Sequence, residues 1–355
     1  MKSRILITGG AGFVGSSLAM AFREKYSEFE IVCLDNLSRM GSELNLPRLK
    51  NSGIRFIKGD IGKKEDFESV GNVDFILECA AEPSVLAGIN SSVEPLFYTN
   101  LYGTINCLEF AKSCGASFVF LSTSRVYPIE PIEQLLYTET ENRFELTDKQ
   151  LLAGVTAKGF AENFPLEGYR SFYGTTKLAS ELLINEYNHF YGVKSVINRC
   201  GVITGPWQMG KVDQGVVVLW LAKHFWKKKL SYIGYGGEGK QVRDILHVKD
   251  LFRLVDWEIH NLEKVNGKTL NAGGGRGVSV SLRELTALCE ELTGNKIEID
   301  KVPENRTADI RIYLTDNSKI TSITGWEPLI KPKEILQDIY FWLRENEKAL
   351  EPILS

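Results

Sequence analysis

The chain has 355 residues, enough to form more than one hydrophobic core, and a formal net charge of −3 without any basic stripe. This charge argues against a nucleic-acid-binding surface, and the lack of a long apolar segment argues against a signal peptide or a membrane span. Because the six cysteines form no Cys-x-x-Cys pair and the four histidines are scattered, we expect a cytoplasmic protein with reduced thiols and no metal site.

The first elements of the chain predict a dinucleotide-binding turn. An apolar strand over 4–8 leads into a glycine-rich turn with the spacing Gly10-x-Gly12-x-x-Gly15, and a helical pattern follows to about residue 25. Glycine lets the backbone lie against a pyrophosphate, and the helix start directs free N–H groups at it. A strand–helix unit without a ligand is the alternative. The candidate cofactor-binding residues of this turn are Gly9, Gly12, Phe13, Val14 and Gly15.

The second predicted strand, over 30–34, ends at an acidic residue, Asp35. A carboxylate at this place accepts hydrogen bonds from both ribose hydroxyls of an adenosine and repels a 2′-phosphate. The sequence therefore favours NAD over NADP.

Further strands are predicted over 54–58, 74–79, 117–122 and 194–199, with helices over about 95–114 and 172–191. Alternating strands and helices indicate an α/β protein with a Rossmann doubly wound parallel sheet, whose ligands bind beyond the carboxyl ends of the strands. The residues that follow the predicted strands are therefore candidates for a site: Asp35-Asn36, Gly59-Asp60, Ala80-Ala81-Glu82, Ser122-Thr123-Ser124 and Arg199-Cys200-Gly201.

After residue 200, glycine-rich turns separate short apolar runs, which indicates a smaller C-terminal α/β lobe for the substrate. We predict an NAD-binding domain over 1–200 and 240–275, and a second lobe over 201–239 and 276–355. The chain from Pro332 to the end is predicted to form one amphipathic helix. Residues 128–170 lack clear periodicity and form either a binding loop or lid, or a surface insertion.

The pair Tyr173 and Lys177 begins the helix before the sixth strand, and its spacing places both side chains on one helix face. A phenol with a pKa of about 10 is a poor base at neutral pH, but a neighbouring ammonium favours the phenolate. Two ordinary surface residues are the alternative. Tyr173 is, however, the only tyrosine of this chain with a lysine four residues later.

Together these motifs resemble the extended short-chain dehydrogenase/reductase superfamily, and within it the nucleotide-sugar epimerases and dehydratases. The segments Ser122 to Tyr127 and Thr99 to Thr104 also contribute to this resemblance. It implies bound NAD, a catalytic hydroxyl at Thr123, a base at Tyr173, and Lys177 holding the nicotinamide ribose. The other cofactor-binding residues implied are Asp35, Asn36, Ser38, Arg39, Asp60, Ile61, Ala80, Ala81, Glu82, Asn100, Ser122 and Arg199.

The subfamily is narrowed by the residues after Thr123. Sugar 4,6-dehydratases carry Asp-Glu there, whereas this chain has Ser124-Arg125, so the acid and base for water elimination are missing. Three downstream segments, 205–208, 212–215 and 239–247, are most similar to the CDP-paratose 2-epimerase (CDP-tyvelose epimerase) family. That resemblance implies substrate contacts from Thr123, Ser124, Gln208, Gln214, Gln241, Arg243 and Arg306, with Arg243 as the diphosphate clamp.

The sequence thus predicts an NAD-dependent epimerase of a nucleotide-diphosphate sugar that acts through a transient keto intermediate, in a homo-oligomer (dimer or tetramer). A 4-epimerase or a keto-sugar reductase on the same scaffold is the first alternative, and a non-catalytic NAD sensor the second. A surface ion pair between Arg243 and Asp244 is the alternative to the clamp. Pro128 and Val202 depart from the family pattern and leave the nucleotide open.

Overall fold

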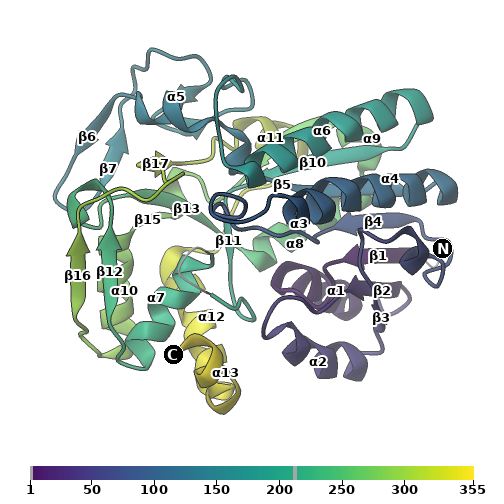
Figure 1. The fold of residues 1–355 in the computed structure, drawn as a ribbon, viewed down its shortest axis with the longest axis horizontal. Helices are drawn as coiled ribbons and strands as arrows, with labels where there is room; N and C mark the ends of the chain where they lie inside the picture. Colours follow the sequence, from purple (N-terminus) through teal and green to yellow (C-terminus); the bar gives the residue numbers. More distant parts are fainter. Residues whose placement is uncertain (1–2, 211–213) are drawn as a thin grey trace. The chain divides into compact units, whose positions relative to one another are not determined.

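The computed structural model describes residues 3–210 and 214–355, and the chain forms two compact units (Figure 1). The first unit comprises Met1–Val126, Ser171–Arg199 and Leu251–Leu270, and the second comprises Tyr127–Arg170, Cys200–Asp250 and Asn271–Ser355. Val212 and Asp213, part of one motif that carried the resemblance, lie outside the described residues.

The first unit contains a seven-stranded sheet with the strand order β14-β10-β5-β4-β1-β2-β3, in which strands β1 to β5 pair in parallel. This confirms the predicted doubly wound sheet, and each predicted strand lies within about two residues of the observed one. The strands are β1 (Arg4–Thr8), β2 (Glu30–Asp35), β3 (Arg55–Lys58), β4 (Phe75–Glu78), β5 (Ser117–Thr123), β10 (Ser195–Cys200) and β14 (Lys268–Ala272).

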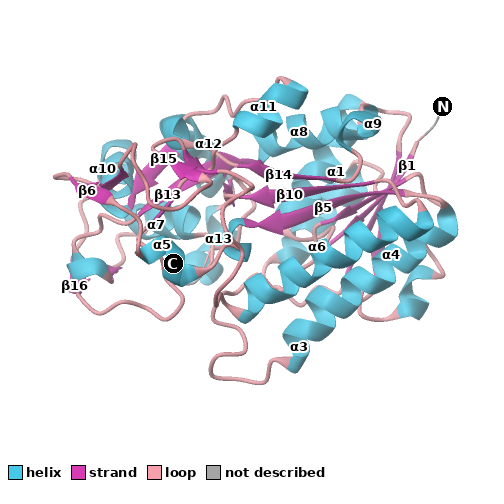
Figure 2. Ribbon diagram, turned by 90° about the horizontal axis from the view of Figure 1, so that it is seen from above, coloured by secondary structure: helices cyan, strands magenta, loops and turns pink. Residues whose placement is uncertain are grey.

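Helices cover both faces of this sheet, with α1, α8 and α9 on one face and α3, α4 and α6 on the other (Figure 2). The strands are apolar along their whole length because both faces are buried. The helices of this unit are α1 (Phe13–Lys25), α2 (Leu46–Asn51), α3 (Glu94–Phe97), α4 (Gly103–Cys114), α6 (Phe172–Tyr191), α8 (Val248–His260) and α9 (Leu262–Val265), with single turns η1 (Ser42–Asn45), η2 (Lys64–Phe67), η3 (Tyr98–Tyr102) and η4 (Ser124–Val126).

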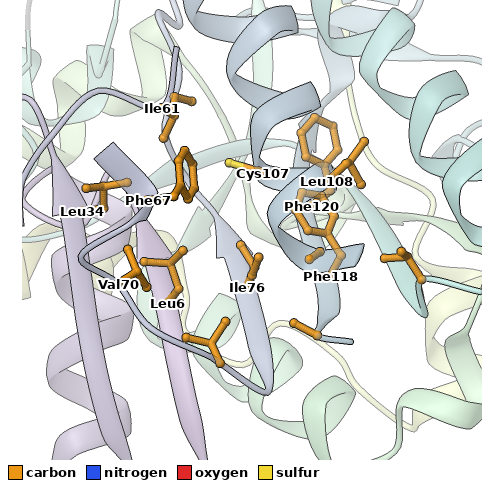
Figure 3. Packing of buried hydrophobic residues seen from close by; sticks show 14 of the residues in the cluster. Leu6, Leu34, Ile61, Phe67, Val70, Ile76, Cys107, Leu108, Phe118 and Phe120 are labelled. Atoms are coloured by element: carbon orange, nitrogen blue, oxygen red, sulfur yellow. The ribbon is translucent and has the colours of Figure 1, made fainter. Parts of the chain in front are cut away.

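A continuous apolar cluster lies between the sheet and α4 (Figure 3). Leu6, Ile76 and Phe118 from the strands meet Cys107 and Leu108 from α4, and all five are fully buried. Each buried large apolar side chain contributes roughly 1.5–3 kcal/mol to folding. This packing holds the carboxyl ends of β1, β4 and β5 in a fixed arrangement.

The predicted helix over 95–114 is divided by η3, a π-helical turn between α3 and α4. Such turns widen the helix locally and recur at functional positions. Asn100, buried at its centre, belongs to this turn.

The second unit contains a small sheet of β11, β13 and β15, with β17 also paired to β13. Two-stranded sheets β12–β16, β6–β7 and β8–β9 accompany it. The strands are β6 (Tyr137–Glu139), β7 (Phe144–Leu146), β8 (Val155–Thr156), β9 (Gly159–Phe160), β11 (Val202–Thr204), β12 (Leu230–Ile233), β13 (Val242–His247), β15 (Ser279–Ser281), β16 (Ile299–Val302) and β17 (Ile312–Tyr313). The helices are α5 (Ile129–Glu133), α7 (Val216–Phe225), α10 (Leu282–Thr293), α11 (Ser318–Thr324), α12 (Pro332–Glu345) and α13 (Glu347–Leu354), with turns η5 (Tyr235–Gly237) and η6 (Arg276–Val278).

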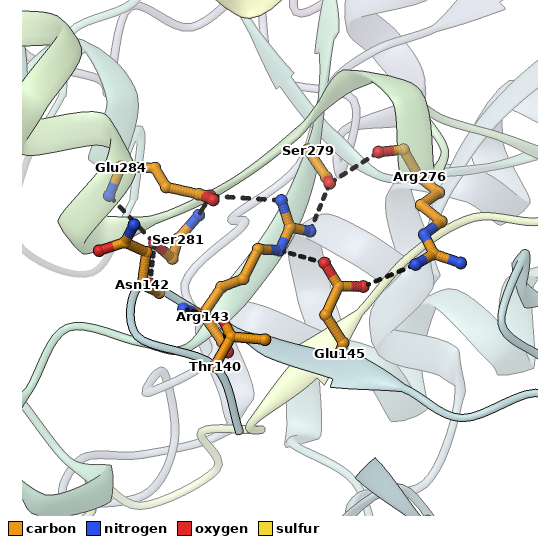
Figure 4. A network of polar contacts seen from close by, with 8 residues as sticks. All are labelled: Thr140, Asn142, Arg143, Glu145, Arg276, Ser279, Ser281 and Glu284. Carbon is orange, nitrogen blue, oxygen red and sulfur yellow. Dashed lines mark hydrogen bonds and ion pairs between the residues drawn. The ribbon is translucent and has the colours of Figure 1, made fainter. Parts of the chain in front are cut away.

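Residues 128–170, left open between a lid and a surface insertion, form helix α5 and two short hairpins that pack within the second unit. Arg143 is central to this packing: its guanidinium contacts Glu145, Glu284 and Ser279 in one network (Figure 4). Phe160 adds a backbone hydrogen bond to Leu314. These contacts explain why the segment groups with the second unit, whereas the sequence placed it with the NAD-binding domain.

Two other expectations differ from the structure. Strand β13, expected in the NAD-binding domain, belongs to the second unit because it pairs with β11, β15 and β17. The single helix expected from Pro332 is instead two helices, α12 and α13, separated at Asn346. The Asn346 side chain donates to the carbonyl of Trp342 and caps the first helix, which ends it there.

Along the described parts of the chain, no helix is both long and apolar enough to cross a membrane. Within those same residues, no cluster of three or more histidine, cysteine or acidic side chains could hold a metal ion.

Candidate active site

The turn between β1 and α1 has the geometry of an anion-binding helix start. Gly9 adopts a φ of +63°, and Gly12 precedes the helix with an extended backbone. A Cβ on Gly15 would lie 2.2 Å from the Gly9 carbonyl oxygen, so the turn closes only with glycine there. The first turn of α1, with Phe13 and Val14, contains no acid and no side-chain cap, so its N–H groups remain available to an anion.

Asp35 lies at the end of β2, next to this turn. Its two carboxylate oxygens accept hydrogen bonds from the backbone N–H groups of Ala11, at 3.1 Å, and Leu37, at 2.7 Å. Burial raises the pKa of Asp35, and these backbone donors oppose the shift. The carboxyl therefore joins the glycine turn to the second strand, and each oxygen retains a lone pair for a further donor.

The loop after β2 and the loop after β3 are joined by side chains. Asn36 donates to the Asp60 carboxylate at 3.0 Å and accepts from the Ser38 N–H group. Ile61 is buried, whereas Ser38 is exposed and Arg39 half-buried. The structure brings these residues to the same edge of the sheet as Asp35 because β1, β2 and β3 are parallel neighbours.

The end of β4 is held to η3 by two backbone contacts of one side chain. The amide of Asn100 accepts from the Glu82 N–H group at 2.8 Å and donates to the Glu82 carbonyl at 3.1 Å. Ala80 and Ala81, half-buried, lie just before it. Asn100 thus shapes the segment after β4, and it also donates to the hydroxyl of Thr176 in α6.

At the end of β5, Ser122 and Thr123 have different surroundings. Ser122 donates to the buried carboxylate of Glu181, which also receives the guanidinium of Arg199 at 2.7 Å. Arg199, expected at the cofactor, forms a buried ion pair with Glu181 that the sequence did not indicate, and Ser122, also expected there, donates a hydrogen bond to the same carboxylate. The Thr123 hydroxyl accepts a hydrogen bond from the Arg125 N–H group at 3.2 Å, and Ser124 begins the next turn.

Helix α6 carries Tyr173 and Lys177 on successive turns. The Ser171 hydroxyl caps the helix by accepting the Gly174 N–H group, which fixes where the helix starts. Tyr173 is half-buried, whereas Lys177 is only 3% exposed, with its Nζ atom 3.8 Å above the ring centre of Phe120. A buried ammonium one turn from a phenol stabilises the phenolate.

In the second unit, the candidate glutamines have local partners. Gln208 accepts from Thr204 at 2.9 Å and donates to the Ile203 carbonyl, and Gln214 is half-buried. Gln241 is 7% exposed and donates to the Ile233 carbonyl, while its Oε1 atom has no hydrogen-bond partner among the described residues. A buried amide oxygen of this kind is able to accept a hydrogen bond from a ligand.

Arg243 on β13 does not pair with Asp244. Its guanidinium contacts the Asp309 carboxylate at 2.7 Å and the carbonyls of Val242 and Ile310. Asp244 is instead fully buried and accepts from the N–H groups of Gly275 and Thr315, and burial raises its pKa to about 6. Arg306 is half-buried three residues before Asp309.

Two acids beside Lys177 were missed by sequence reasoning. Glu181 lies one turn after Lys177 on α6, and Glu78 ends β4 with 1% of its surface exposed. The signal for Glu78 was present as an acid at the end of the apolar run Phe75-Ile76-Leu77. A charged residue in a strand buried on both faces rarely occurs without a partner.

The comparisons with known proteins agree with this geometry. The model of the NAD dependent epimerase/dehydratase family matches residues 5–273. The chain is 31% identical to CDP-paratose 2-epimerase of Salmonella typhi, over 96% of this chain and 98% of that protein. It is 30% identical to a putative UDP-glucose 4-epimerase of Methanocaldococcus jannaschii, over 97% of this chain and 100% of that protein. The solved structure of dTDP-glucose 4,6-dehydratase from Bacillus anthracis, in complex with NAD, has a TM-score of 0.77 at 26% identity and covers 99% of each chain.

A doubly wound sheet with a glycine turn at the first helix and a Tyr–Lys pair on α6 defines an enzyme that binds a dinucleotide. The chain belongs to the NAD-dependent epimerase/dehydratase family, and its cofactor is NAD. Gly12 has no Cβ, and within 4 Å of the place where one would stand the only atom is the Gly9 carbonyl oxygen. The backbone there is open to a pyrophosphate, which fits that cofactor.

Proposed function

We propose that this enzyme epimerises a nucleotide-activated sugar, at C2 of a CDP-deoxyhexose. The observation that carries the proposal is the combination of the Tyr173–Lys177 pair with a Thr123 that is followed by Ser124-Arg125 rather than by two acids. This set provides a base and a hydrogen-bonding hydroxyl but no acid–base pair for elimination of water. The likeness to CDP-paratose 2-epimerase over nearly the whole chain supports the CDP sugar.

In the proposed reaction, Tyr173 removes the proton of a sugar hydroxyl while Thr123 holds that oxygen by a hydrogen bond. Lys177 lowers the energy of the phenolate by its charge. When bound, NAD would accept the hydride of the carbon and later donate it back. Tyr173 would return its proton to the sugar oxygen in the same reduction. Inversion at the carbon would require the keto sugar to turn between the two hydride transfers.

We assign the binding of NAD to the first unit and the binding of the sugar-nucleotide substrate, with its diphosphate, to the second unit. NAD is proposed to be held by the glycine turn, Asp35, Asn36, Asp60 and Asn100. The other residues that the sequence predicts to bind the cofactor are proposed to contact it as well. The second-unit residues proposed for the substrate are Gln208, Gln214, Gln241, Arg243 and Arg306. The buried, unpartnered oxygen of Gln241 and the two N–H groups that Arg243 retains support this assignment.

The deciding experiment uses CDP-paratose that carries deuterium at C2. We expect the 2-epimer to form with its deuterium retained, because the hydride leaves and returns to the same carbon without exchange. Loss of deuterium to solvent would mean deprotonation at carbon and would overturn the mechanism. Net release of reduced cofactor would indicate a reductase, and inversion of UDP-glucose at C4 a 4-epimerase. Failure with CDP, UDP, dTDP and GDP sugars would favour the sensor.

We further propose a cytoplasmic homo-oligomer. The exposed apolar side chains Tyr102, Leu182, Phe190 and Tyr191 lie on η3 and α6, each with 55% to 69% of its surface exposed. Such a set on adjacent helices favours burial against a second copy. Six free cysteines support a reducing compartment. Light scattering coupled to gel filtration, with Phe190→Lys as the disrupting variant, tests the assembly.

A further inference from the structure

Glu78 is a fully buried acid that the proposed chemistry does not use. It ends β4 in the first unit, with 1% of its surface exposed. Its Oε1 atom lies 2.6 Å from the hydroxyl of Thr104, and its Oε2 atom has no hydrogen-bond partner within the described chain. A buried carboxyl that is only half satisfied is costly, so its presence requires an explanation.

The neighbours of Glu78 place it beside Lys177. In the sheet, Glu78 lies opposite Phe120 of β5 and opposite Thr8 of β1. Directly paired residues of neighbouring strands project to the same face, about 4.8 Å apart. The ammonium of Lys177 lies 3.8 Å above the Phe120 ring. The carboxyl and the ammonium therefore occupy adjacent positions on one face of the sheet.

The charged and titratable groups that face Glu78 are few. Lys177 comes from α6 and Cys107 from α4, whereas β1 and β5 present Thr8 and Phe120. Burial raises the pKa of Glu78 to about 7, and the ammonium of Lys177 and the hydroxyl of Thr104 oppose that rise. The carboxyl thus changes charge close to neutral pH.

The hydrogen bonds around Glu78 accommodate both of its protonation states. When Glu78 is ionised, the Thr104 hydroxyl donates to it, and the Ser180 hydroxyl, 3.2 Å from the Asn100 carbonyl, donates to that carbonyl. When Glu78 is protonated, it donates to Thr104, whose own hydrogen turns to the Asn100 carbonyl at 2.8 Å. In either state the hydrogen of the Thr104 hydroxyl has an acceptor, whereas the Oε2 atom of Glu78 gains no partner, and Ser180 belongs to the helix that carries Tyr173.

We propose that Glu78 is a positioning residue for the Tyr173–Lys177 pair: its buried carboxyl balances the charge of Lys177 and sets the pH at which Tyr173 becomes a base. Ionised Glu78 attracts Lys177 and disfavours a phenolate nearby, whereas neutral Glu78 leaves the full positive charge to the phenolate. This inference rests on the proposed role of Tyr173 as the base.

The test measures the ionisation of Tyr173 directly, without turnover. The NAD-saturated enzyme is titrated by ultraviolet difference spectroscopy against its Tyr173→Phe counterpart, so that only this phenol contributes. The same is done in Glu78→Gln and in Glu258→Gln. Glu258 is a matched control, because it is fully buried in the same unit and burial raises its pKa to about 8, with Asn198 rather than a cation as its partner.

In Glu78→Gln we expect Tyr173 to ionise at a pH lower by about half a unit or more, because a nearby negative charge is removed. Glu258→Gln should titrate as the wild type does. The proposal is overturned by an unshifted Tyr173 in Glu78→Gln, by an equal shift in Glu258→Gln, or by a Tyr173 that stays protonated in all three until unfolding.

A second measurement applies even where Glu78→Gln does not fold. Carboxyl-carbon NMR of glutamate-labelled protein follows Glu78 and Glu258 together in wild type and in Lys177→Met. By reciprocity of the coupling, loss of the ammonium should move the Glu78 titration to higher pH and leave Glu258 unchanged. An unmoved Glu78 overturns the proposal. Absence of turnover on any nucleotide sugar would refute the proposed function alone, since neither measurement uses a substrate.

Discussion

Tyr173 and Lys177 differ in exposure although they are one helical turn apart. Tyr173 is half-buried and able to meet a ligand, whereas Lys177 is almost completely enclosed above Phe120. A long cationic side chain in such a place is costly unless its charge is used. The two side chains therefore fit different roles: the phenol of Tyr173 exchanges the proton, and the ammonium of Lys177 stabilises the phenolate by its positive charge.

Tyr173→Phe removes the hydroxyl and keeps the ring, so folding and NAD binding should survive. General-base catalysis contributes roughly 10²–10⁴-fold, and kcat should fall by about that factor. Thr123→Val should cost less, because it removes one hydrogen bond and leaves the proton acceptor. Steady-state kinetics of both variants with bound NAD check this order. A Thr123→Val defect larger than that of Tyr173→Phe would contradict the assigned roles.

Asp35 should decide the choice of cofactor. Its carboxylate lies beside the glycine turn, and Asp35→Ala removes both the acceptor for the ribose hydroxyls and the repulsion of a 2′-phosphate. We expect weaker NAD binding and a smaller preference for NAD over NADP, measured as two Kd values by calorimetry. Asp35→Asn, which keeps an acceptor and loses the charge, should admit NADP with a smaller loss of NAD affinity. An unchanged preference in both variants would remove Asp35 from the ribose site.

Arg243 should affect the sugar nucleotide without affecting NAD. Loss of a charge-assisted contact to a diphosphate costs about 1.5–3 kcal/mol, so Arg243→Ala should raise KM roughly ten- to hundredfold. Lys240→Ala is the control, because it removes a neighbouring ion pair, that with Glu139, outside the proposed contacts. The measurement is KM together with NAD occupancy. If NAD occupancy collapses in Arg243→Ala while KM is normal, the clamp assignment is wrong.

Among the elements, the glycine turn and the π-helical turn shape the edge of the sheet that we propose to hold NAD. The first brings the N–H groups of α1 to the end of β1, and the second presents Asn100 to the backbone of Glu82. Both depend on backbone geometry rather than on side-chain charge. Small changes of main-chain shape in these turns should therefore alter NAD affinity more than they alter the rest of the unit.

Gly15→Ala tests the glycine turn. Its new Cβ would lie 2.2 Å from the Gly9 carbonyl oxygen, so the turn must open. We expect NAD to bind at least about tenfold more weakly, equivalent to about 1.4 kcal/mol, with the melting temperature lowered as well. Gly277→Ala is the control, since no atom lies within 4 Å of its added Cβ and its φ is ordinary. Equal NAD affinities in the two variants would show that the turn is not shaped as described.

Considered as a whole, each unit is assembled from three separate stretches of the chain and contains buried acids. Glu78 and Glu258 lie in the first unit and Asp244 in the second, and burial raises the pKa of all three. A carboxyl whose pKa is higher in the folded than in the unfolded state stabilises the fold at low pH. That contribution decreases as the pH rises.

Glu258 allows this dependence of the free energy of unfolding on pH to be measured at one residue. Its pKa is about 8 in the fold, against 4.5 as the ordinary value, so the folded state holds a proton that the unfolded state releases. Stability should therefore fall between these two pH values. Glu258→Gln removes this titrating group. The free energy of unfolding of the variant minus that of the wild type should therefore be larger at about pH 9 than at about pH 5, by on the order of a few kcal/mol. Urea unfolding at both values checks it, and a pH-independent difference would contradict the raised pKa.

Local patterns in the sequence were sufficient for six of the seven strands of the first unit, whereas β14 was not predicted as a strand. Apolar runs of strand length, the Gly10-x-Gly12-x-x-Gly15 spacing and the acid at Asp35 each follow from the neighbouring residues, and the structure has the strands where they were predicted. Helix α6 also begins at the predicted place, because Ser171 caps it. These features depend on periodicity and capping, which short stretches of chain encode by themselves.

Tertiary structure alone decided which distant residues meet. The pairing of Arg199 with Glu181 and of Arg243 with Asp309, the place of Glu78 beside Lys177, and the grouping of 128–170 with the second unit join residues far apart in the chain. Short hairpins carry little periodicity, and the division of a final helix depends on one asparagine cap. Strand register and burial determine these contacts, and a single sequence states neither, because both arise from packing between segments separated by tens of residues.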